Sequence, residues 1–371
     1  MKDRIYTDHA ATTFLSPVAL EAMMPYLTDK FGNPSSLHSF GEEASKAVYK
    51  ARTEIADIFC CEPENIVFTS GGSEADNQAI KTIVSGRRSS VLLISAAEHH
   101  AVLNSANSIT DSKIEIIPIS PCKSGYIDPE SVSIAIERTE KSVCGGSFML
   151  ANNETGAISD ICKISEIIHE YGGIIHTDAV QAAGHILIDF KKLGVDLMSV
   201  SAHKFHGPKG IGALIHNGCS IPRSLIHGGS QERGLRAGTE NVASIIGMAA
   251  ALSESAKNME RDTAHIFHLK DMLISGLLPL GAIVNGGGLP GILSVRFPNG
   301  DGEALVRSLD LFGIAASAGA ACNSKEVGTS HVLLSMGLTH DEAAATVRFS
   351  LDASNTDDEI RRIITVMSEL V

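Results

Sequence analysis

Short apolar runs alternate with helix-like segments from about residue 66 to residue 217, and this alternation constrains the fold more than any other feature. The runs at 91–96, 113–119, 147–152, 173–179, 197–202 and 211–216 are mostly continuous in apolar residues, as is typical of strands covered on both faces. Between them lie segments such as "DICKISEIIHEYGG", which predicts a helix that Asp160 caps and Gly172 ends. The pattern predicts an α/β fold with a doubly wound, mostly parallel sheet flanked by helices.

The C-terminal part of the chain follows a different pattern. We expect a helix over about 262–278, strands at 291–297 and 346–351, and a final helix over "DDEIRRIITVMSEL". Because a single hydrophobic core stops growing at roughly 250–300 residues, a chain of 371 residues predicts a second domain. The expected division is a large domain at 14–257 and a smaller α+β domain formed by 1–13 and 258–371.

Charge and composition narrow the class of protein. The net charge of −13 argues against direct binding of nucleic acid or of an anionic membrane by the chain as a whole. No apolar run approaches the roughly 20 residues of a membrane span, and "MKDRIYTDHAATT" does not have the pattern of a signal peptide. Seven cysteines, an odd number without a C-x-x-C pair, predict free thiols in the reducing cytoplasm.

Polar residues follow four of the predicted strands. They are Glu98, His99 and His100; Asn152 and Asn153; Asp178 and Gln181; and His203 and Lys204. A single residue of this kind is usually a satisfied turn group, and Lys204 alone could be a solvated turn lysine. Because ligands bind beyond the carboxyl ends of the strands in open parallel sheets, four such groups at one edge predict a ligand site.

Two glycine-rich stretches could bind phosphate. "FTSGGSEADNQAI" predicts a strand, a glycine turn and a helix beginning near Ser73, whose free backbone N–H groups would form an anion site. The alternative is a helix that Ser73 caps without any ligand. Gly286, Gly288 and Gly291 match G-x-G-x-x-G, but Pro290 interrupts the run and a strand follows, so we interpret this stretch as a turn.

The set of a lysine, an aspartate, a glutamine, a histidine and an anion-binding helix start matches the needs of pyridoxal 5′-phosphate. A lysine amine forms a Schiff base with its aldehyde, and an aspartate near the ring nitrogen keeps that nitrogen protonated. A metal site is not expected, because the spacings of His99 with His100 and of His203 with His206 fit no common ligand set.

Motifs in the order of one known family run along almost the whole chain. They include "YTDHAATT", "FGNPSSLHSFG", "FTSGGSEADN", "AEHHAV", "ANNETG", "HTDAVQAAG", "SAHKFHGPKGIGAL", "HGGSQERGLRAGTEN", "LPGILSV", "SAGAACNS" and "VRFSL". The chain resembles the cysteine desulfurases of the NifS/IscS type, in the class V aminotransferase group of fold-type I pyridoxal-phosphate enzymes. The resemblance implies a fold-type I transferase that acts on L-cysteine as a homodimer.

The resemblance also assigns roles to individual residues. Lys204 carries the Schiff base, Asp178 pairs with the pyridinium nitrogen, Gln181 contacts the phenolic oxygen and His99 stacks on the ring. The remaining implied contacts are Gly72, Ser73, Ser201 and His203 to the phosphate; Thr239 to the phosphate of the neighbouring subunit; Asn153 to cofactor or substrate; and Asn33 and Arg348 to the substrate carboxylate.

Cys322 is the implied nucleophile, although a buried cysteine in a turn of small residues would be the ordinary interpretation. Its thiolate would take the sulfur of L-cysteine, leaving L-alanine and a persulfide that passes to a protein acceptor. The acceptor could be an iron–sulfur scaffold, a tRNA-thiolation enzyme or a DNA phosphorothioation system. The rival functions are selenocysteine lyase or an aminotransferase on the same scaffold, and a non-catalytic interaction protein.

Several residues depart from the family pattern. His9 stands where Asn or Tyr is common, Ala320 and Asn323 flank the cysteine in place of Ser and Thr, and Asp352 follows "RFSL" in place of Gly. None of these changes removes a catalytic group. His206, two residues after Lys204, has no role in this interpretation.

Overall fold

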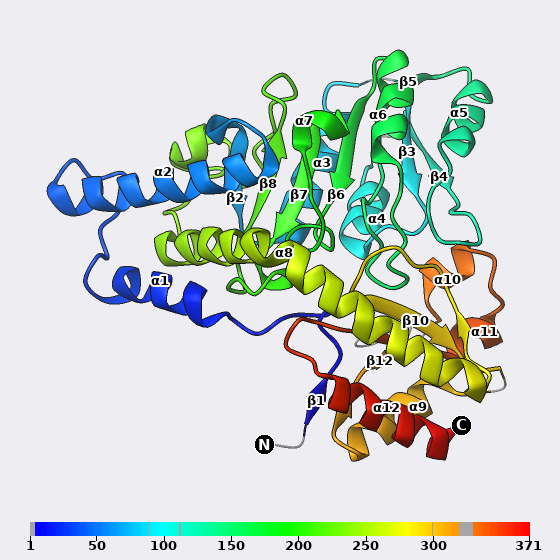
Figure 1. The fold of residues 1–371 in the computed structure, drawn as a ribbon. Helices are drawn as coiled ribbons and strands as arrows, with labels where there is room; N and C mark the ends of the chain where they lie inside the picture. The colour runs from blue at the N-terminus through cyan, green and yellow to red at the C-terminus, as the bar shows by residue number, and fades with distance from the viewer. Residues whose placement is uncertain (1–3, 88, 111–112, 299, 319–328) are drawn as a thin grey trace.

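A seven-stranded sheet forms the centre of the larger part of the molecule, in a computed structural model that describes residues 4–87, 89–110, 113–298, 300–318 and 329–371 (Figure 1). Its strand order is β2-β8-β7-β6-β5-β3-β4, and β7, β6, β5, β3 and β4 run parallel. Strand β8 pairs antiparallel with both β7 and β2. The strands are β2 (Ile66–Thr69), β3 (Ser90–Ser95), β4 (Ile114–Ile119), β5 (Ser142–Ser147), β6 (Ile174–Asp178), β7 (Leu197–Ser201) and β8 (Gly212–His216). The predicted mostly parallel sheet is confirmed.

Helices cover both faces of this sheet. Alternate residues of β3 belong to different cores, because Val91 and Leu93 face one layer of helices and Leu92 and Ile94 face the other. One core takes side chains from α2 (Ser39–Phe59), α5 (Pro129–Glu137), α6 (Ile161–Glu170) and the start of α8 (Val242–Leu277); the other takes them from α3 (Gly72–Val84) and α4 (His100–Asn107). The helices α1 (Pro17–Thr28) and α7 (Phe190–Leu193) complete this part.

Two predicted elements differ from the structure. The strand expected at 147–152 is β5 and ends at Ser147, and the apolar residues after it are buried beyond the strand end. The sequence "VCGGS" did not indicate a strand because two of its residues are glycines rather than large apolar residues. Glycine is needed where the backbones of β5 and β6 lie close together: a Cβ on Gly145 would lie 2.0 Å from the carbonyl oxygen of Ile174 in β6. The helix expected at 262–278 begins at Val242, where Asn241 caps it by accepting from the backbone N–H of Ser244.

A second core lies among the C-terminal elements. Strands β12 (Ser317–Ala318), β13 (Thr346–Ser350), β10 (Ile292–Arg296) and β9 (Ile283–Val284) form one sheet, and β1 (Ile5–Tyr6) pairs with β11 (Ile314–Ala315). Packed on them are the end of α8, α9 (Gly302–Leu311) and α12 (Asp357–Leu370). The short helices α10 (His331–Ser335) and α11 (His340–Ala344) precede β13 in the chain. The domain boundaries at 13/14 and 257/258 stay a prediction.

The glycines at 286–288 lead into β10 rather than into a helix, which confirms that a strand follows this stretch; Gly288 itself forms an isolated β-bridge with Ala157. In the described part of the chain, none of the helices combines the length and apolar character that crossing a lipid bilayer requires.

Candidate active site

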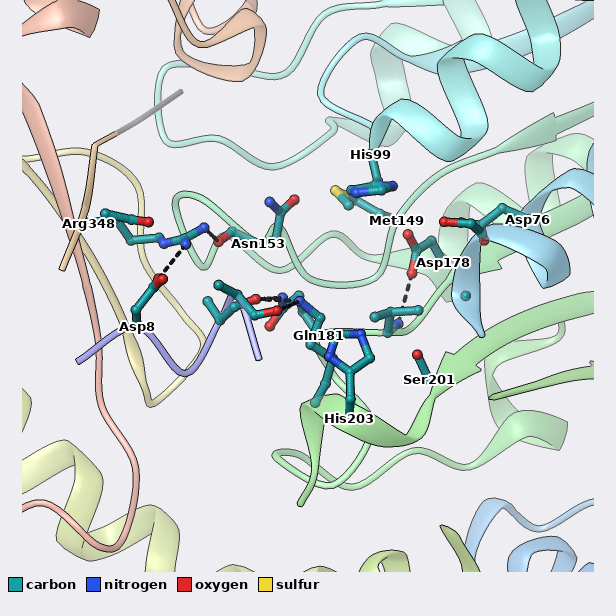
Figure 2. A pocket seen from close by; sticks show the side chains of 17 residues that line it. Asp8, Asp76, His99, Met149, Asn153, Asp178, Gln181, Ser201, His203 and Arg348 are labelled. Atoms are coloured by element: carbon teal, nitrogen blue, oxygen red, sulfur yellow. Dashed lines mark hydrogen bonds and ion pairs between the residues drawn. The ribbon is translucent and has the colours of Figure 1, made fainter. Parts of the chain in front are cut away.

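A cavity of about 310 Å³ lies at the carboxyl ends of the parallel strands (Figure 2). Most of the predicted site residues line it, namely Gly72, Ser73, His99, Asn153, Asp178, Gln181, Ser201, His203, Lys204 and Arg348. They come from the start of α3, from strand ends and loops of the large sheet and from the middle of β13, so the fold brings together residues that are far apart in the sequence. The lining also includes Asp8, Ala10, Ala11, Asp76, Met149, Val180 and Ser317, which the sequence interpretation did not select.

Lys204 reaches the cavity from a short 3₁₀ turn, Ala202–Lys204, that follows β7. Its Nζ donates hydrogen bonds to the carbonyl oxygens of Ala10 and, at 3.0 Å, Ala11. The amide of Gln181 also donates to the carbonyl oxygen of Ala10, at 2.8 Å. The N-terminal segment therefore holds the lysine amine and Gln181 at the same point of the cavity wall.

Asp178 is a buried carboxylate at the end of β6. Its Oδ1 accepts a hydrogen bond of 2.8 Å from the backbone N–H of Val180, and the residue is 4% exposed. Burial raises the pKa of Asp178 to about 6, against the lowering effects of the Val180 N–H and of Lys204. A cationic ligand atom beside it would relieve this burial cost, since an opposite charge favours the ionised carboxylate.

Asp76 is a second buried carboxylate, and sequence reasoning missed it. It lines the cavity from α3, and Figure 2 shows it close to Asp178 in the view. Burial and the charge of Asp178 raise the pKa of Asp76, so two such groups favour one proton between them. Asp76 lies four residues after Gly72 on one helix, and this i, i+4 spacing is the signal that could have found it.

His99 caps α4 and lies on the opposite side of the cavity from Gln181 and His203 (Figure 2). Its Nδ1 accepts from the backbone N–H of Ala101 at 3.1 Å. Burial, followed by the charge of Lys204, lowers the pKa of His99 to about 4, so the ring is neutral at pH 7. Because Nδ1 is an acceptor, the neutral ring carries its proton on Nε2.

The start of α3 forms an anion-binding end of the cavity. Gly71 is the N-cap and offers no side-chain hydrogen bond, so the first N–H groups of the helix stay available. The alternative of a helix capped by Ser73 is therefore wrong, because Ser73 lies inside the first turn. A second hollow shares Gly72, Ser73, Ser201 and His203 with the cavity and adds Thr12 and Lys209. A Cβ on Gly72 would lie 2.8 Å from Cγ2 of Val180, so only glycine leaves this space open.

Arg348 enters from β13 on the side of the cavity away from α3. Its Nη2 donates to Oδ1 of Asp8 at 2.8 Å, and its Nη1 donates to the carbonyl oxygen of Asn153 at 2.9 Å. Its Nε is buried without a hydrogen-bond partner among the described residues. The two bonds use two of the five N–H groups of the guanidinium, so each Nη keeps a second N–H for a ligand.

Two predicted site residues of the described part of the chain do not line the cavity, and a third cannot be placed. Asn33 is between α1 and α2, where its Oδ1 accepts from the backbone N–H of Ser35. Thr239 lines a separate hollow together with Glu232 and Arg236. Cys322 lies outside the described residues.

The loop that carries Thr239 is held by a buried ion pair. The carboxylate of Glu232 binds the Arg52 guanidinium through bonds of 2.6 and 3.0 Å and accepts from the backbone N–H of Phe68 at 2.9 Å. The two side chains are 3% and 8% exposed. This arrangement anchors the loop at 228–241 to β2 and α2.

We expect Glu232→Ala to lower the free energy of unfolding by about 3–5 kcal/mol, because it leaves the Arg52 charge buried without its partner. Denaturant unfolding followed by circular dichroism measures this. Glu303→Ala, which removes an exposed pair with Arg307, is the control and should cost no more than about 0.5 kcal/mol. Equal losses in the two variants would contradict the prediction.

In the part of the chain that the structure describes, no group of three or more His, Cys, Asp or Glu side chains could hold a metal ion. The six cysteines within the described ranges are free thiols.

Comparison with known proteins agrees with this geometry. The aminotransferase class-V family matches residues 5–363. A cysteine desulfurase IscS of Clostridium botulinum is 41% identical and covers 100% of this chain and 95% of its own length. The fold superposes on a NifS-like protein with a TM-score of 0.92 at 34% identity, covering 99% of both chains. It also superposes on SspA in complex with cysteine, with a TM-score of 0.82 at 31% identity over 95% of this chain and 100% of that one. The chain therefore belongs to the aminotransferase class-V family and is a cysteine desulfurase of the NifS/IscS type.

Proposed function

We propose that the enzyme takes sulfur from L-cysteine, releases L-alanine and holds the sulfur as a persulfide on Cys322 before passing it to a protein acceptor. The single observation that carries this proposal is the cavity, which joins a lysine amine, a buried carboxylate, a neutral histidine and an anion-binding helix start. Arg348 at the other side supplies a cation for an amino-acid carboxylate.

The residues fit pyridoxal 5′-phosphate, which the family implies. The open cradle at Gly71 and Gly72 suits a phosphate, together with the hydroxyls of Ser73 and Ser201 and the ring of His203. Asp178 suits the ring nitrogen, Lys204 the covalent attachment, Gln181 the phenolic oxygen and His99 the ring face. When bound, this cofactor withdraws electrons from the substrate carbon atoms and so weakens the bonds to them.

Side chains of the protein would bind the substrate carboxylate and supply a hydrogen-bond donor. The guanidinium of Arg348, which lines the cavity, would bind the substrate carboxylate through its remaining Nη N–H groups while it stays bonded to Asp8 and Asn153. The neutral His99, with its proton on Nε2, supplies a donor above the reacting atoms and adds no positive charge.

Sulfur transfer then follows a balanced exchange. The Cys322 thiolate forms an S–S bond with the substrate sulfur, and the substrate C–S bond breaks with its electron pair left on carbon. That carbon takes up a proton equivalent to the one lost from the substrate thiol and becomes the methyl group of alanine. The negative charge ends on the persulfide.

A second copy of the chain would complete the active site by supplying Thr239, so we infer that the enzyme is a homodimer. Thr239 lies away from the Lys204 cavity, as expected of a residue that serves the site of a neighbouring subunit. Large apolar side chains of the described chain are exposed on α1, on the segment after it and at the start of α2; they include Val18, Leu20, Met24, Leu27, Phe31, Leu37 and Phe40. These observations support a homodimer. The free thiols support a reducing compartment such as the cytoplasm.

Product analysis tests the function. Protein loaded with pyridoxal phosphate should convert L-cysteine into equal amounts of L-alanine and, with a thiol reductant, sulfide. A selenocysteine lyase would act on L-selenocysteine alone, and an aminotransferase would give a keto acid instead of alanine. A protein that stays colourless with added cofactor would support the non-catalytic alternative.

The identity of the sulfur acceptor needs a second experiment. Mass spectrometry of candidate acceptor proteins mixed with persulfidated enzyme would show whether sulfur passes to an iron–sulfur scaffold, a tRNA-thiolation enzyme or a DNA phosphorothioation protein.

We expect Asp178→Asn to lower kcat by about a hundredfold or more, because a neutral amide cannot stabilise the protonated ring nitrogen of the cofactor. The visible absorption band of the holoenzyme should shift as well. Steady-state kinetics and the spectrum measure these effects. Asp310→Asn, at an exposed position of α9, should leave both unchanged, and a wild-type kcat for Asp178→Asn would rule out the proposed role.

A further inference from the structure

Three residues that depart from the family pattern or lack a role, His9, His206 and Asp352, meet beside the Lys204 turn. Nε2 of His206 lies 2.9 Å from Oδ2 of Asp352, a residue 146 positions away in the chain. The rings of His9 and His206 lie 6.5 Å apart. The cluster thus joins the turn after β7, the segment after β1 and the end of β13.

Both ring nitrogens of His206 face acceptors. Nδ1 lies 3.3 Å from the carbonyl oxygen of Phe14, and Nε2 faces the carboxylate of Asp352. A neutral imidazole can donate from only one nitrogen, so the imidazolium alone satisfies both contacts. The side chains of His206 and Asp352 are 17% and 9% exposed, which shields the pair from water and salt.

Further hydrogen bonds hold the backbone of His206 and both the side chain and the backbone of Asp352 in place. His206 adopts the left-handed conformation with φ of 63°, donates its backbone N–H to Oγ1 of Thr13 at 2.8 Å and accepts from the N–H of Ser16 at 2.9 Å. Asp352 accepts from the backbone N–H of Ser354 at 2.9 Å, and its own N–H donates to Oδ1 of Asn355 at 3.0 Å. The pair therefore links two rigid points, one two residues from Lys204 and the other four residues from Arg348.

Charged and titratable groups from several elements face His206. They are Asp352, Glu254 of α8, His9 and His185. The two carboxylates favour the charged ring. Burial lowers the pKa values of His9 and His185, so these neighbours stay neutral at pH 7 and add no competing positive charge.

We propose that His206 and Asp352 are a positioning pair, which holds the Lys204 turn against the end of β13 and so keeps Arg348 in place to bind the substrate carboxylate. This inference rests on the proposed role of Arg348. Neither His206 nor Asp352 is among the described residues that line the cavity, so the pair acts through the two elements that it joins.

The pair operates within a pH window. Hydrogen bonding to Asp352 and its charge raise the pKa of His206 above its ordinary value near 6.5, despite burial. A raised pKa in the folded state stabilises the fold below pH 6.5, and this contribution is lost as the pH rises through the folded value. The pKa of Asp352 is lowered in spite of burial, chiefly by its bond to His206, so its contribution holds above its ordinary value near 3.8. Both contributions are therefore present in full between about pH 4 and 6.5, and the contribution of His206 is lost as the pH rises through its folded pKa.

The test compares Asp352→Asn with wild-type holoenzyme across pH 6 to 9. At pH 6 the variant should raise KM for L-cysteine about three- to tenfold and keep kcat within about twofold, since the lost contact is a charge-assisted hydrogen bond that acts on binding. The ratio of variant to wild-type KM cancels ionisations that both proteins share, and it should fall towards one at pH 9. The melting temperature, with and without cofactor, should be about 2–5 °C lower at pH 6 and nearly equal at pH 9.

His206→Asn provides a second route, because asparagine tolerates the left-handed backbone. It should reproduce the KM change, and the double variant should add little to either single change, as expected for two partners of one interaction. Asp357→Asn, which removes an exposed contact with His268, is the matched control and should leave KM unchanged at every pH.

A KM ratio that stays at one, or that is raised equally at pH 6 and pH 9, would overturn the inference. So would a loss confined to kcat. Failure of the proposed function is distinguishable, because wild-type protein would then not desulfurate L-cysteine, whereas the melting temperatures would still report on the pair.

Discussion

Lys204→Ala should lower the rate of L-cysteine desulfuration by at least about a thousandfold, because among the described residues that line the cavity Lys204 alone carries an amine that could attach an aldehyde cofactor covalently. The variant should still fold, since Lys204 is a partly exposed residue of a short turn and its hydrogen bonds go to two backbone carbonyls. Sulfide and alanine release measure the rate.

Borohydride reduction gives a second readout of the same change. Reduced wild-type protein should keep the cofactor on the chain after denaturation, and the variant should lose it. Lys192→Ala, at an exposed lysine paired with Asp189, controls for loss of a positive charge and should stay within about twofold of wild type. A Lys204→Ala enzyme within tenfold of wild type would mean that another group holds the cofactor.

Cys322→Ser should abolish sulfide release, with a loss of at least about a thousandfold, and leave cofactor absorbance intact. A serine hydroxyl is not ionised at neutral pH and cannot carry persulfide sulfur, so the chemistry stops at bound substrate. The measurements are sulfide release with a thiol reductant and the mass of the protein after exposure to L-cysteine.

The exposed thiols provide matched controls for this change. Cys219→Ser and Cys162→Ser remove cysteines that the structure places at the surface, and both should keep wild-type activity and the added mass of one sulfur. Wild-type turnover by Cys322→Ser would refute the assignment of the nucleophile. It would also favour a lyase that releases its product without a protein persulfide.

Local patterns in the sequence were sufficient to predict the parallel sheet and most of the residues that line the cavity. Buried parallel strands are continuous apolar runs, and parallel strands end at one edge, so His99, Asp178 and Lys204 could be placed together before any coordinates. The same reasoning misplaced β5, because its pair of glycines serves close backbone contact and carries no apolar signal.

Contacts between segments that are far apart in the sequence could not be predicted from these local patterns. Asp8 lines the cavity only because β1 pairs with β11 and brings the N-terminal segment against Arg348. Asp76 carried a signal in its helical spacing from Gly72, yet its burial beside Asp178 depends on how α3 packs on the sheet. Asn33 and Thr239 were placed by motif, and the fold of one chain leaves both outside the cavity.

The sequence by itself determined the α/β class, the strand-end chemistry around Lys204 and the family, since these depend on residue types at short spacing. Only the tertiary structure decided that His206 faces Asp352, that Arg348 is bound to Asp8 and to the carbonyl of Asn153, and that the start of α3 is open to an anion. The physical reason is the range of the interactions. Periodicity and capping act within a few residues, whereas a buried ion pair forms where two separately folded segments meet, and no local pattern encodes that meeting.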